Sequence, residues 1–179
     1  MEIVNFGMLS ETQVTQAAQM LTDELHDGWP ALTDAMEEID ALLNGGPDSL
    51  LLAAVDKDEV IGWAGLLPGY GKMFELHPLV IRGDRQRKGT GTILLREMMR
   101  AAREKGGLTL LAGSGDEKPG GETSLANVNL YEGLPGHIAA FDPGTHQSAF
   151  YMKHGFKLVG VVPDVYGYGK PDIQMAIRL

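Results

Sequence analysis

A basic, glycine-containing loop is the first part of the sequence whose residue types suggest chemistry. Residues 85–95 read RQRKGTGTILL, so that three cations and two glycines directly precede an apolar run. The first turn of a helix carries partial positive charge and unpaired N–H groups, and cations beside it are normally unfavourable. A bound anion removes this conflict, because glycines let it approach the backbone closely. The loop therefore indicates an anion site.

Different interpretations of this loop imply different ligands. Gln86-x-x-Gly89-x-Gly91 can be an ordinary strand-to-helix turn that binds nothing. It lacks the G-K-[ST] ending of a P-loop and does not follow the first strand of a Rossmann unit, so neither nucleotide fingerprint applies. Arg87 and Lys88 favour a polyphosphate, whose negative groups they would accompany while the helix N-terminus holds a pyrophosphate.

The segment before the loop, KMFELHPLVI (72–81), predicts a strand with two titratable side chains on one face. Regular alternation places Glu75, His77 and Leu79 on that face and the apolar residues with even numbers, Val80 among them, on the other. Glu75 and His77 either point into a ligand site or form an ordinary solvated face.

Pro78 should interrupt the pairing of this strand. Proline cannot donate to a sheet ladder, so we expect a bulge or a splay at this position. The irregularity would free backbone groups of Leu79 and Ile81 to pair with an extended ligand.

A tyrosine near the C-terminus is the third candidate. Tyr151 lies in HQSAFYMKHG (146–155), which predicts a short helix ended by Gly155. An aromatic residue there is usually part of a core, but we expect Phe150 to pack in the core and the Tyr151 hydroxyl to serve a polar purpose.

Hydrophobic periodicity and turn residues predict an α+β domain with a mixed, mostly antiparallel sheet and flanking helices. The short links between the strands in 49–81 require antiparallel neighbours, and the crossover from 72–81 to 108–115 requires a parallel pair. Residues 116–145 show no clear period. The expected strands are 2–6, 49–56, 60–68, 72–81, 108–115, 157–165 and 172–179, and the expected helices are 10–25, 33–43, 93–102 and 146–155.

Composition narrows the class of protein. The chain has 179 residues, a net charge of −9, no cysteine and only five histidines, so disulfides, thiolate catalysis and a metal site are not expected. The acidic charge argues against nucleic acid or a membrane as partner, and it suits a cationic substrate, although it can serve solubility alone. The beginning of the sequence lacks the pattern of a signal peptide, which predicts a cytoplasmic protein.

The motifs together resemble the GNAT family of N-acetyltransferases. The matching segments are ELHPLV, the Gln86-x-x-Gly89-x-Gly91 loop and FYMKHGF followed by a strand. WPALTD, LPGYG, FYMKHGFKLVGVVP and GKPDIQMA are similar to the aminoglycoside 6'-N-acetyltransferases of the subclass that contains chromosomal enterococcal enzymes. The resemblance spans the chain and implies a single domain over 1–179 with a splayed strand pair, acetyl-coenzyme A as co-substrate, a cationic amine as acceptor, a homodimer and a role in antibiotic resistance.

The resemblance also implies residue roles. Glu75 would take a proton from the amine, with His77 as second candidate, the Leu79 N–H would polarise the thioester carbonyl, and Tyr151 would protonate the leaving thiolate. The implied coenzyme A contacts are Leu79, Val80, Ile81, Arg87, Lys88, Gly89, Thr90, Gly91, Thr92, His146 and Tyr151. The implied substrate contacts are Trp29, Tyr70, Glu75, Asp116, Asp142 and Asp172.

The sequence departs from the family in two places. GSGDEKPGGETSL is longer than the corresponding loop and has lost an acidic residue, and His146 and Gln147 stand near the position of a common family asparagine. Other acceptors, a polyamine or a protein N-terminus, and a coenzyme-A-binding or drug-sequestering module with weak turnover, stay open as alternatives.

Overall fold

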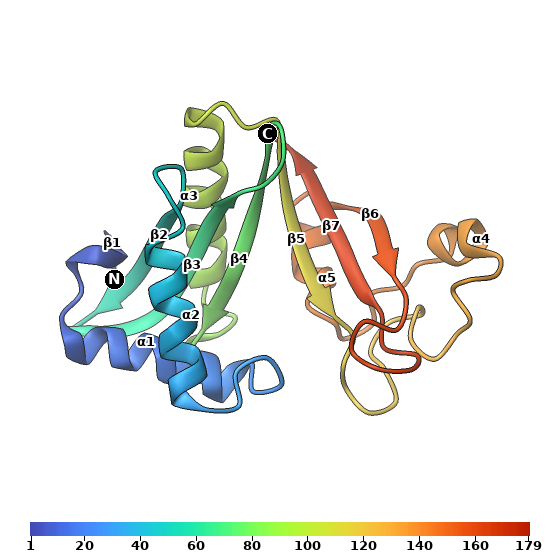
Figure 1. Ribbon diagram of the computed structural model, residues 1–179, viewed down its shortest axis with the longest axis horizontal. Helices are drawn as coiled ribbons and strands as arrows, with labels where there is room; N and C mark the ends of the chain where they lie inside the picture. Colours follow the sequence, from blue (N-terminus) through green and yellow to red (C-terminus); the bar gives the residue numbers. More distant parts are fainter. The chain divides into compact units, whose positions relative to one another are not determined.

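The computed structural model describes residues 1–179, which divide into one unit of residues 1–110 with Leu179 and a second unit of residues 111–178 (Figure 1). None of the helices combines the length and the hydrophobicity that a membrane-spanning segment requires. The first unit contains β1 (Glu2–Asn5), the 3-10 turn η1 (Phe6–Met8), α1 (Glu11–Glu24), α2 (Leu32–Leu43), β2 (Leu50–Asp56), β3 (Glu59–Pro68), β4 (Met73–Ile81), the 3-10 turn η2 (Gly83–Arg85) and α3 (Thr90–Glu104). The second contains α4 (Leu134–Ala139), α5 (Ser148–Lys153), β6 (Lys157–Val162) and β7 (Asp172–Arg178), and β5 (Thr109–Gly115) begins in the first unit and continues into the second.

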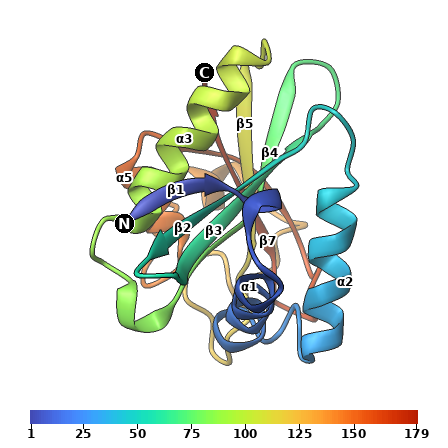
Figure 2. The same ribbon diagram turned by 90° about the vertical axis from the view of Figure 1, so that its left-hand side faces the viewer.

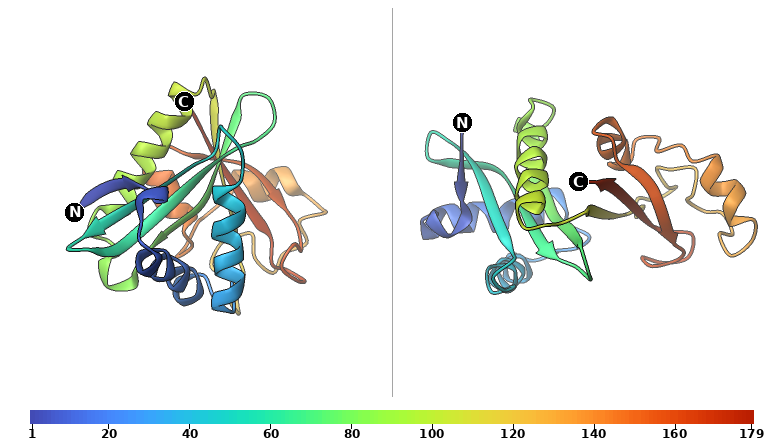
Figure 3. Two further views of the ribbon diagram at one scale, coloured as in Figure 1. Left: turned by 60° about the vertical axis from the view of Figure 1, so that its left-hand side comes forward. Right: turned by 90° about the horizontal axis from the view of Figure 1, so that it is seen from above.

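The strands follow the order β1-β2-β3-β4-β5-β7-β6. Neighbours from β1 to β4 are antiparallel, and so are β6 and β7. The predicted α+β class with a mostly antiparallel sheet and flanking helices is confirmed. In the first unit, α1 and α2 cover one face of β2 to β4 and α3 covers the other (Figures 2 and 3).

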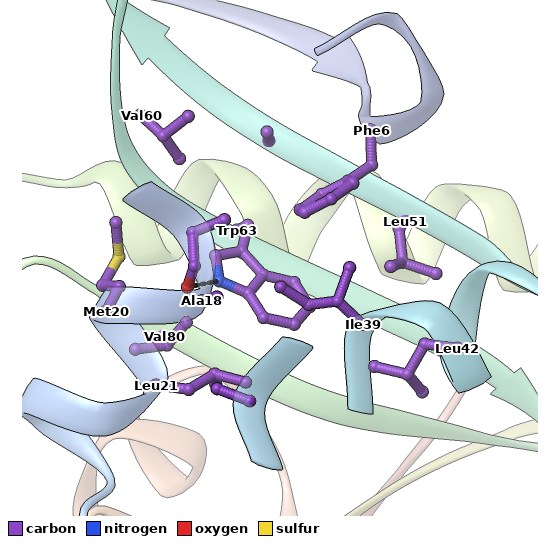
Figure 4. Close-up of a cluster of buried hydrophobic side chains, with 13 residues drawn as sticks. Phe6, Ala18, Met20, Leu21, Ile39, Leu42, Leu51, Val60, Trp63 and Val80 are labelled. Carbon is purple, nitrogen blue, oxygen red and sulfur yellow. Dashed lines mark hydrogen bonds between the residues drawn. The ribbon is translucent and has the colours of Figure 1, made fainter. Parts of the chain in front are cut away.

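A tryptophan organises the core under α1 and α2. Trp63 is fully buried and donates its indole N–H to the Ala17 carbonyl at 3.0 Å, so its one polar atom is satisfied (Figure 4). Phe6 packs against its ring edge to face at 5.3 Å. The core continues through Ile39 of α2 and Val80 of β4, which places this part of β4 against the two helices.

One short helix was missed by the sequence pattern. α4 lies within residues 116–145, which we expected to be irregular. Its N-cap is Gly133, with φ 63°, and a proline stands in its first turn. None of its six residues is buried, so it has no apolar stripe that periodicity could detect. Most other differences concern the ends of elements. For example, β6 ends at Val162, whereas the sequence predicted a strand that continues to residue 165.

The expected irregularity at Pro78 is confirmed as a bulge. Leu66 pairs with Leu76 and Ala64 with Leu79, so His77 and Pro78 together lie opposite the single residue Gly65. The extra residue reverses the alternation of side chains along β4.

This reversal corrects the predicted faces of β4. Trp63 pairs with Val80 and Leu67 with Glu75, so Val80 lies on the same face as Glu75, toward α1 and α2. Leu79 instead shares the face of Leu76. The prediction that grouped Leu79 with Glu75 and His77 was wrong because it assumed an unbroken period of two.

Gly65 should be required at the bulge. A Cβ at this position would overlap the carbonyl oxygen of His77, which is backbone and cannot rotate away. Gly65→Ala should therefore lower the free energy of unfolding by roughly 1 to 3 kcal/mol, measured by urea denaturation. Gly113→Ala is the matched control, because its Cβ would meet only Asp172 oxygens at 3.7 Å. An equal effect of the two substitutions would contradict a tight bulge.

Candidate active site

The face of β4 that α1 and α2 cover carries the first group of candidate residues. Glu75 and His77 are half-buried there, two residues apart, with Glu75 before the bulge and His77 at its first position. Trp29, from the segment between α1 and α2, lies beside the His77 ring with centroids 5.9 Å apart. The first unit thus brings together three of the residues that the sequence analysis proposed.

Glu38 of α2 joins this group and was not foreseen. Its Oε1 lies 3.3 Å from His77 Nε2, and the side chains are 28 % and 38 % exposed. The two residues are 39 positions apart in the sequence. Glu38 follows another glutamate on an amphipathic helix, a pattern that is typical of a solvated face, so no local signal distinguishes it.

Glu75 differs from Glu38 because its carboxylate has no partner. No hydrogen bond or ion pair joins it to another group of the first unit, although the side chain is half-buried. A half-buried, unpaired carboxylate is able to receive a cation or a proton from a ligand. Tyr70, proposed for substrate stacking, lies in the turn between β3 and β4 and is 84 % exposed.

The backbone after the bulge has the orientation expected for pairing with a ligand. The Arg82 N–H donates to the Ile61 carbonyl, so Arg82 occupies a hydrogen-bonded position of the antiparallel pair. Because such positions alternate, the N–H groups of Leu79 and Ile81 point away from β3. Val80, also proposed as a cofactor contact, has its side chain in the core.

The basic loop after β4 presents backbone donors. Arg87 has φ 56° and Gly89 has φ 94°, so two residues in the left-handed region turn the chain into α3. No side chain caps α3, and the N–H groups of residues 87–91 donate to no acceptor in the first unit. Successive unpaired N–H groups at the N-terminus of a 15-residue helix form an anion-binding concavity.

The cations of this loop divide into two groups. Arg85 pairs with Asp56 at 3.1 Å, and the Lys88 ammonium donates to the Asp84 carbonyl at 2.7 Å, so both are held by the protein. The N-terminal ammonium group, with Arg85, lowers the pKa of Asp56 below its ordinary value. Arg87 is exposed and has no partner in its unit, which leaves its full charge for a ligand.

A glutamate of α1 holds the loop in place and was also missed by the sequence analysis. Glu24 accepts the Gly83 N–H at 2.7 Å and the Gln86 amide at 2.9 Å. The same amide donates to the Ile81 carbonyl at 3.0 Å. Glu24 and Gln86 together connect α1, the end of β4 and the loop, so the glutamine of the loop motif has a structural function.

Tyr151 lies in the second unit and is more deeply buried than expected. It is 5 % exposed and packs against Phe150 and Phe156, with ring centroids 5.4 Å and 5.3 Å apart. Phe150, which we expected in the core, is only half-buried, so the two residues exchange the predicted environments. Burial raises the pKa of Tyr151 above its ordinary value, and the hydroxyl has no hydrogen-bond partner within the second unit.

His146, which the resemblance implied as a cofactor contact, is 2 % exposed. Its Nδ1 lies 3.0 Å from the Ser148 hydroxyl, and its Nε2 lies 3.1 Å from the Ser114 hydroxyl and 3.0 Å from the Gly115 carbonyl. Both ring nitrogens are therefore engaged inside the protein, and His146 connects β5 to the beginning of α5, the helix that carries Tyr151.

The acidic candidates of the second unit lie in different environments. Asp116 is fully buried, and its two oxygens accept the N–H groups of Glu122 and Thr123 at 2.8 Å each. Its expected role in substrate binding is therefore replaced by a structural one, which is to order the following loop. Asp142 is exposed and accepts the Gly144 N–H, and Asp172 is half-buried.

Tyr166 is an exposed aromatic residue near Asp172. Partial burial raises the pKa of its hydroxyl, and the charge of Asp172 raises it further.

No group of three or more potential metal ligands is present in the chain.

The fold and this arrangement of groups correspond to a known class of enzymes. The acetyltransferase (GNAT) family model matches residues 15–118, which include β4 and the basic loop, and the chain belongs to that family. It is an acetyl-coenzyme-A-dependent N-acetyltransferase, and the cofactor expected from the sequence is confirmed.

Solved structures of aminoglycoside 6'-N-acetyltransferases are similar to the whole chain, as the sequence motifs suggested. One such enzyme complexed with coenzyme A shares 33 % identity, with 99 % of this chain and 97 % of that one covered and a TM-score of 0.88. The enzyme from Enterococcus faecium shares 31 % identity over the same fractions, with a TM-score of 0.87. A type Ii aminoglycoside 6'-acetyltransferase shares 29 % identity over the same fractions, with a TM-score of 0.75. A search of curated protein sequences found no match.

The raised pKa of Tyr151 predicts a stability change in alkali. Because the folded-state pKa lies above the ordinary value of about 10, the unfolded chain loses this proton first, and stability falls as the pH rises above 10. Between pH 9 and pH 11 the parent should lose about 1 kcal/mol more unfolding free energy than Tyr151→Phe, measured by urea denaturation at both pH values. Equal losses would mean that the hydroxyl is solvated in the folded protein.

Proposed function

We propose that this N-acetyltransferase transfers the acetyl group of acetyl-coenzyme A to the 6'-amine of an aminoglycoside. The observation that carries the proposal is the unpaired Glu75 carboxylate on the same face of β4 as His77, whose ring lies beside Trp29. The chain is also similar over its whole length to enzymes of this activity. Carboxylates attract the ammonium groups of such a substrate, and an aromatic ring suits the flat face of a sugar. Tyr70, Asp142 and Asp172 are the further proposed substrate contacts, and Asp116 is left out because it is buried.

The proposed coenzyme A site uses the backbone of β4 and of the loop before α3. The pantetheine arm would pair with Leu79 and Ile81, whose N–H groups point away from β3. The pyrophosphate would accept hydrogen bonds from the unpaired N–H groups of residues 87–91, that of Thr90 among them, and from Thr92, with Arg87 and Lys88 nearby. The Thr90 hydroxyl itself is buried and donates to Met1 Sδ. No acidic residue occupies the first turn of α3, so no carboxylate of that turn competes with an anion for these donors.

In the proposed chemistry the acetyl group passes directly from acetyl-coenzyme A to the amine. The ammonium loses one proton to Glu75, directly or through one water, because only the neutral amine carries a lone pair. That lone pair attacks the thioester carbon, and the Leu79 N–H stabilises the oxyanion. The C–S bond then breaks, the nitrogen loses a second proton to a base or to solvent, and the thiolate gains one from Tyr151. Tyr151 regains a proton from solvent, so one proton in total is released.

Tyr151 can act only while negative charge develops on sulfur. A thiol has a pKa of about 8.5, below that of tyrosine, so full transfer to a free thiolate is uphill. Burial raises the pKa of Tyr151 further and keeps its proton in place. We expect a contribution of about 10²-fold to kcat from this residue.

A panel of amines tests the proposal. Thiol release from acetyl-coenzyme A should be efficient with aminoglycosides that carry a 6'-amine and weak with those that carry a 6'-hydroxyl. Efficient turnover of polyamines or of peptide N-termini would favour the corresponding alternative. Coenzyme A binding without turnover of any amine would favour a binding or sequestering module.

Several properties stay predictions that accompany this function. We propose that both units act as one domain over 1–179, that two copies form a homodimer, and that the protein acts in the cytoplasm and contributes to antibiotic resistance. The acidic net charge of −9 supports a cationic small molecule rather than nucleic acid or a membrane as partner.

Reversal of charge in the loop should weaken coenzyme A binding. Arg87→Glu combined with Lys88→Glu places two carboxylates beside the proposed pyrophosphate, and we expect Kd to rise roughly 10- to 100-fold, measured by calorimetry. Arg103→Glu at the other end of α3 is the control and should leave Kd unchanged. Unchanged affinity of the double variant would contradict the proposal that this loop binds the pyrophosphate.

Replacement of Glu75 tests the proposed base. Glu75→Gln keeps size and polarity but removes the charge, and kcat/KM for the aminoglycoside should fall by roughly 10² to 10⁴ in steady-state assays. If the carboxylate only anchors the cation, KM should rise while kcat stays constant. Parent-like kcat and KM would contradict both roles, and His77→Gln in the same assay measures the second candidate.

A further inference from the structure

The contact between α2 and β4 places a carboxylate on one nitrogen of a histidine that lies beside the proposed base. Glu38 Oε1 is 3.3 Å from His77 Nε2, and no other side chain of the first unit hydrogen-bonds to either group. Trp29 lies against the same ring with an interplanar angle of 49°. The imidazole is therefore held from two sides, by a hydrogen bond and by an aromatic face.

The carboxylate determines which ring nitrogen carries the proton. An ionised carboxylate only accepts hydrogen bonds, so a neutral His77 must present Nε2–H to Glu38, and its lone pair then lies on Nδ1. Nδ1 has no hydrogen-bond partner within the first unit. Glu38 from α2 is the charged group that contacts the ring, and Glu75 lies two residues before His77 on the same face of β4. The next carboxylate on this side of α2, Asp34, accepts the Ala31 N–H at 3.2 Å.

We propose that Glu38 is a positioning residue that holds His77 as the Nε2–H tautomer, so that Nδ1 accepts one of the two protons that the amine loses. The inference rests on the proposed function, in which Glu75 takes the other proton. When Nδ1 is protonated, the imidazolium is stabilised by its hydrogen bond to the Glu38 carboxylate. The proton on Nδ1 then passes to solvent.

The tautomer can be measured without turnover. In protein with ¹⁵N-labelled histidine at a pH where His77 is neutral, the ring nitrogen shifts should report the proton on Nε2, with His77→Gln assigning the signals. Glu38→Leu removes the acceptor at similar length and should shift the population toward Nδ1–H, while Glu38→Gln, which keeps an acceptor oxygen, should have a smaller effect. An Nδ1–H tautomer in the parent, or no change in Glu38→Leu, would overturn the positioning role even if the enzyme is active.

Steady-state kinetics then separate positioning from substrate binding. Glu38→Leu should lower kcat with the preferred amine about 10- to 100-fold at nearly constant KM, and it should have little effect in the His77→Gln background, because the carboxylate acts through that ring. Glu37→Leu, at the neighbouring exposed position of α2, is the matched control and should resemble the parent. A loss that persists in the His77→Gln background, or that appears in KM alone, would overturn the proposal.

The two measurements also distinguish this inference from the proposed function. A parent without turnover on any amine, but with the Nε2–H tautomer that depends on Glu38, would contradict aminoglycoside acetylation and leave the positioning of His77 intact. An active parent whose tautomer and kcat do not change when Glu38 is replaced would support aminoglycoside acetylation and contradict the positioning of His77.

Discussion

The bulge at Pro78 is the constraint on which the arrangement of the site depends. Two residues of β4 lie opposite Gly65, whose missing Cβ makes room for the His77 carbonyl. Glu75 before the bulge and His77 at its first position point toward α1 and α2, where Trp29 and Glu38 contact the histidine. After the bulge, the side chains exchange faces. One extra residue thus separates a segment that presents side chains from one that presents backbone donors.

In the basic loop, too, side chains and backbone donors have different functions. Most of its cations are held by internal acceptors, since Arg85 pairs with Asp56 and Lys88 reaches a backbone carbonyl. Glu24 fixes the loop from α1 through two further hydrogen bonds. The anion site that we propose consequently depends on N–H groups held in a fixed geometry, and less on the number of positive side chains. Preorganised donors need no rearrangement when an anion binds.

The two units offer complementary chemical groups. The first contains an unpaired carboxylate and a histidine oriented by a second carboxylate, which are groups able to accept protons. The second contains Tyr151, whose burial keeps it protonated, on a helix that His146 and two serines anchor to β5. In the mechanism proposed above, deprotonation of the amine and protonation of the thiolate are thereby assigned to different parts of the chain.

The sequence by itself determined most of the elements, the strand that carries Glu75 and His77, an irregularity at Pro78 and the glycine loop, because each depends on local periodicity, proline or glycine. Only the tertiary structure decided which side chains meet. Glu38 contacts His77 although the two are 39 residues apart in the sequence. Asp116, a candidate for substrate binding, is buried and orders a loop. None of the residues of α4 is buried, so periodicity could not detect this helix. Contacts of this kind depend on how helices pack on the sheet, and no local pattern specifies them. The sequence could therefore predict the candidate residues, whereas packing determined their partners.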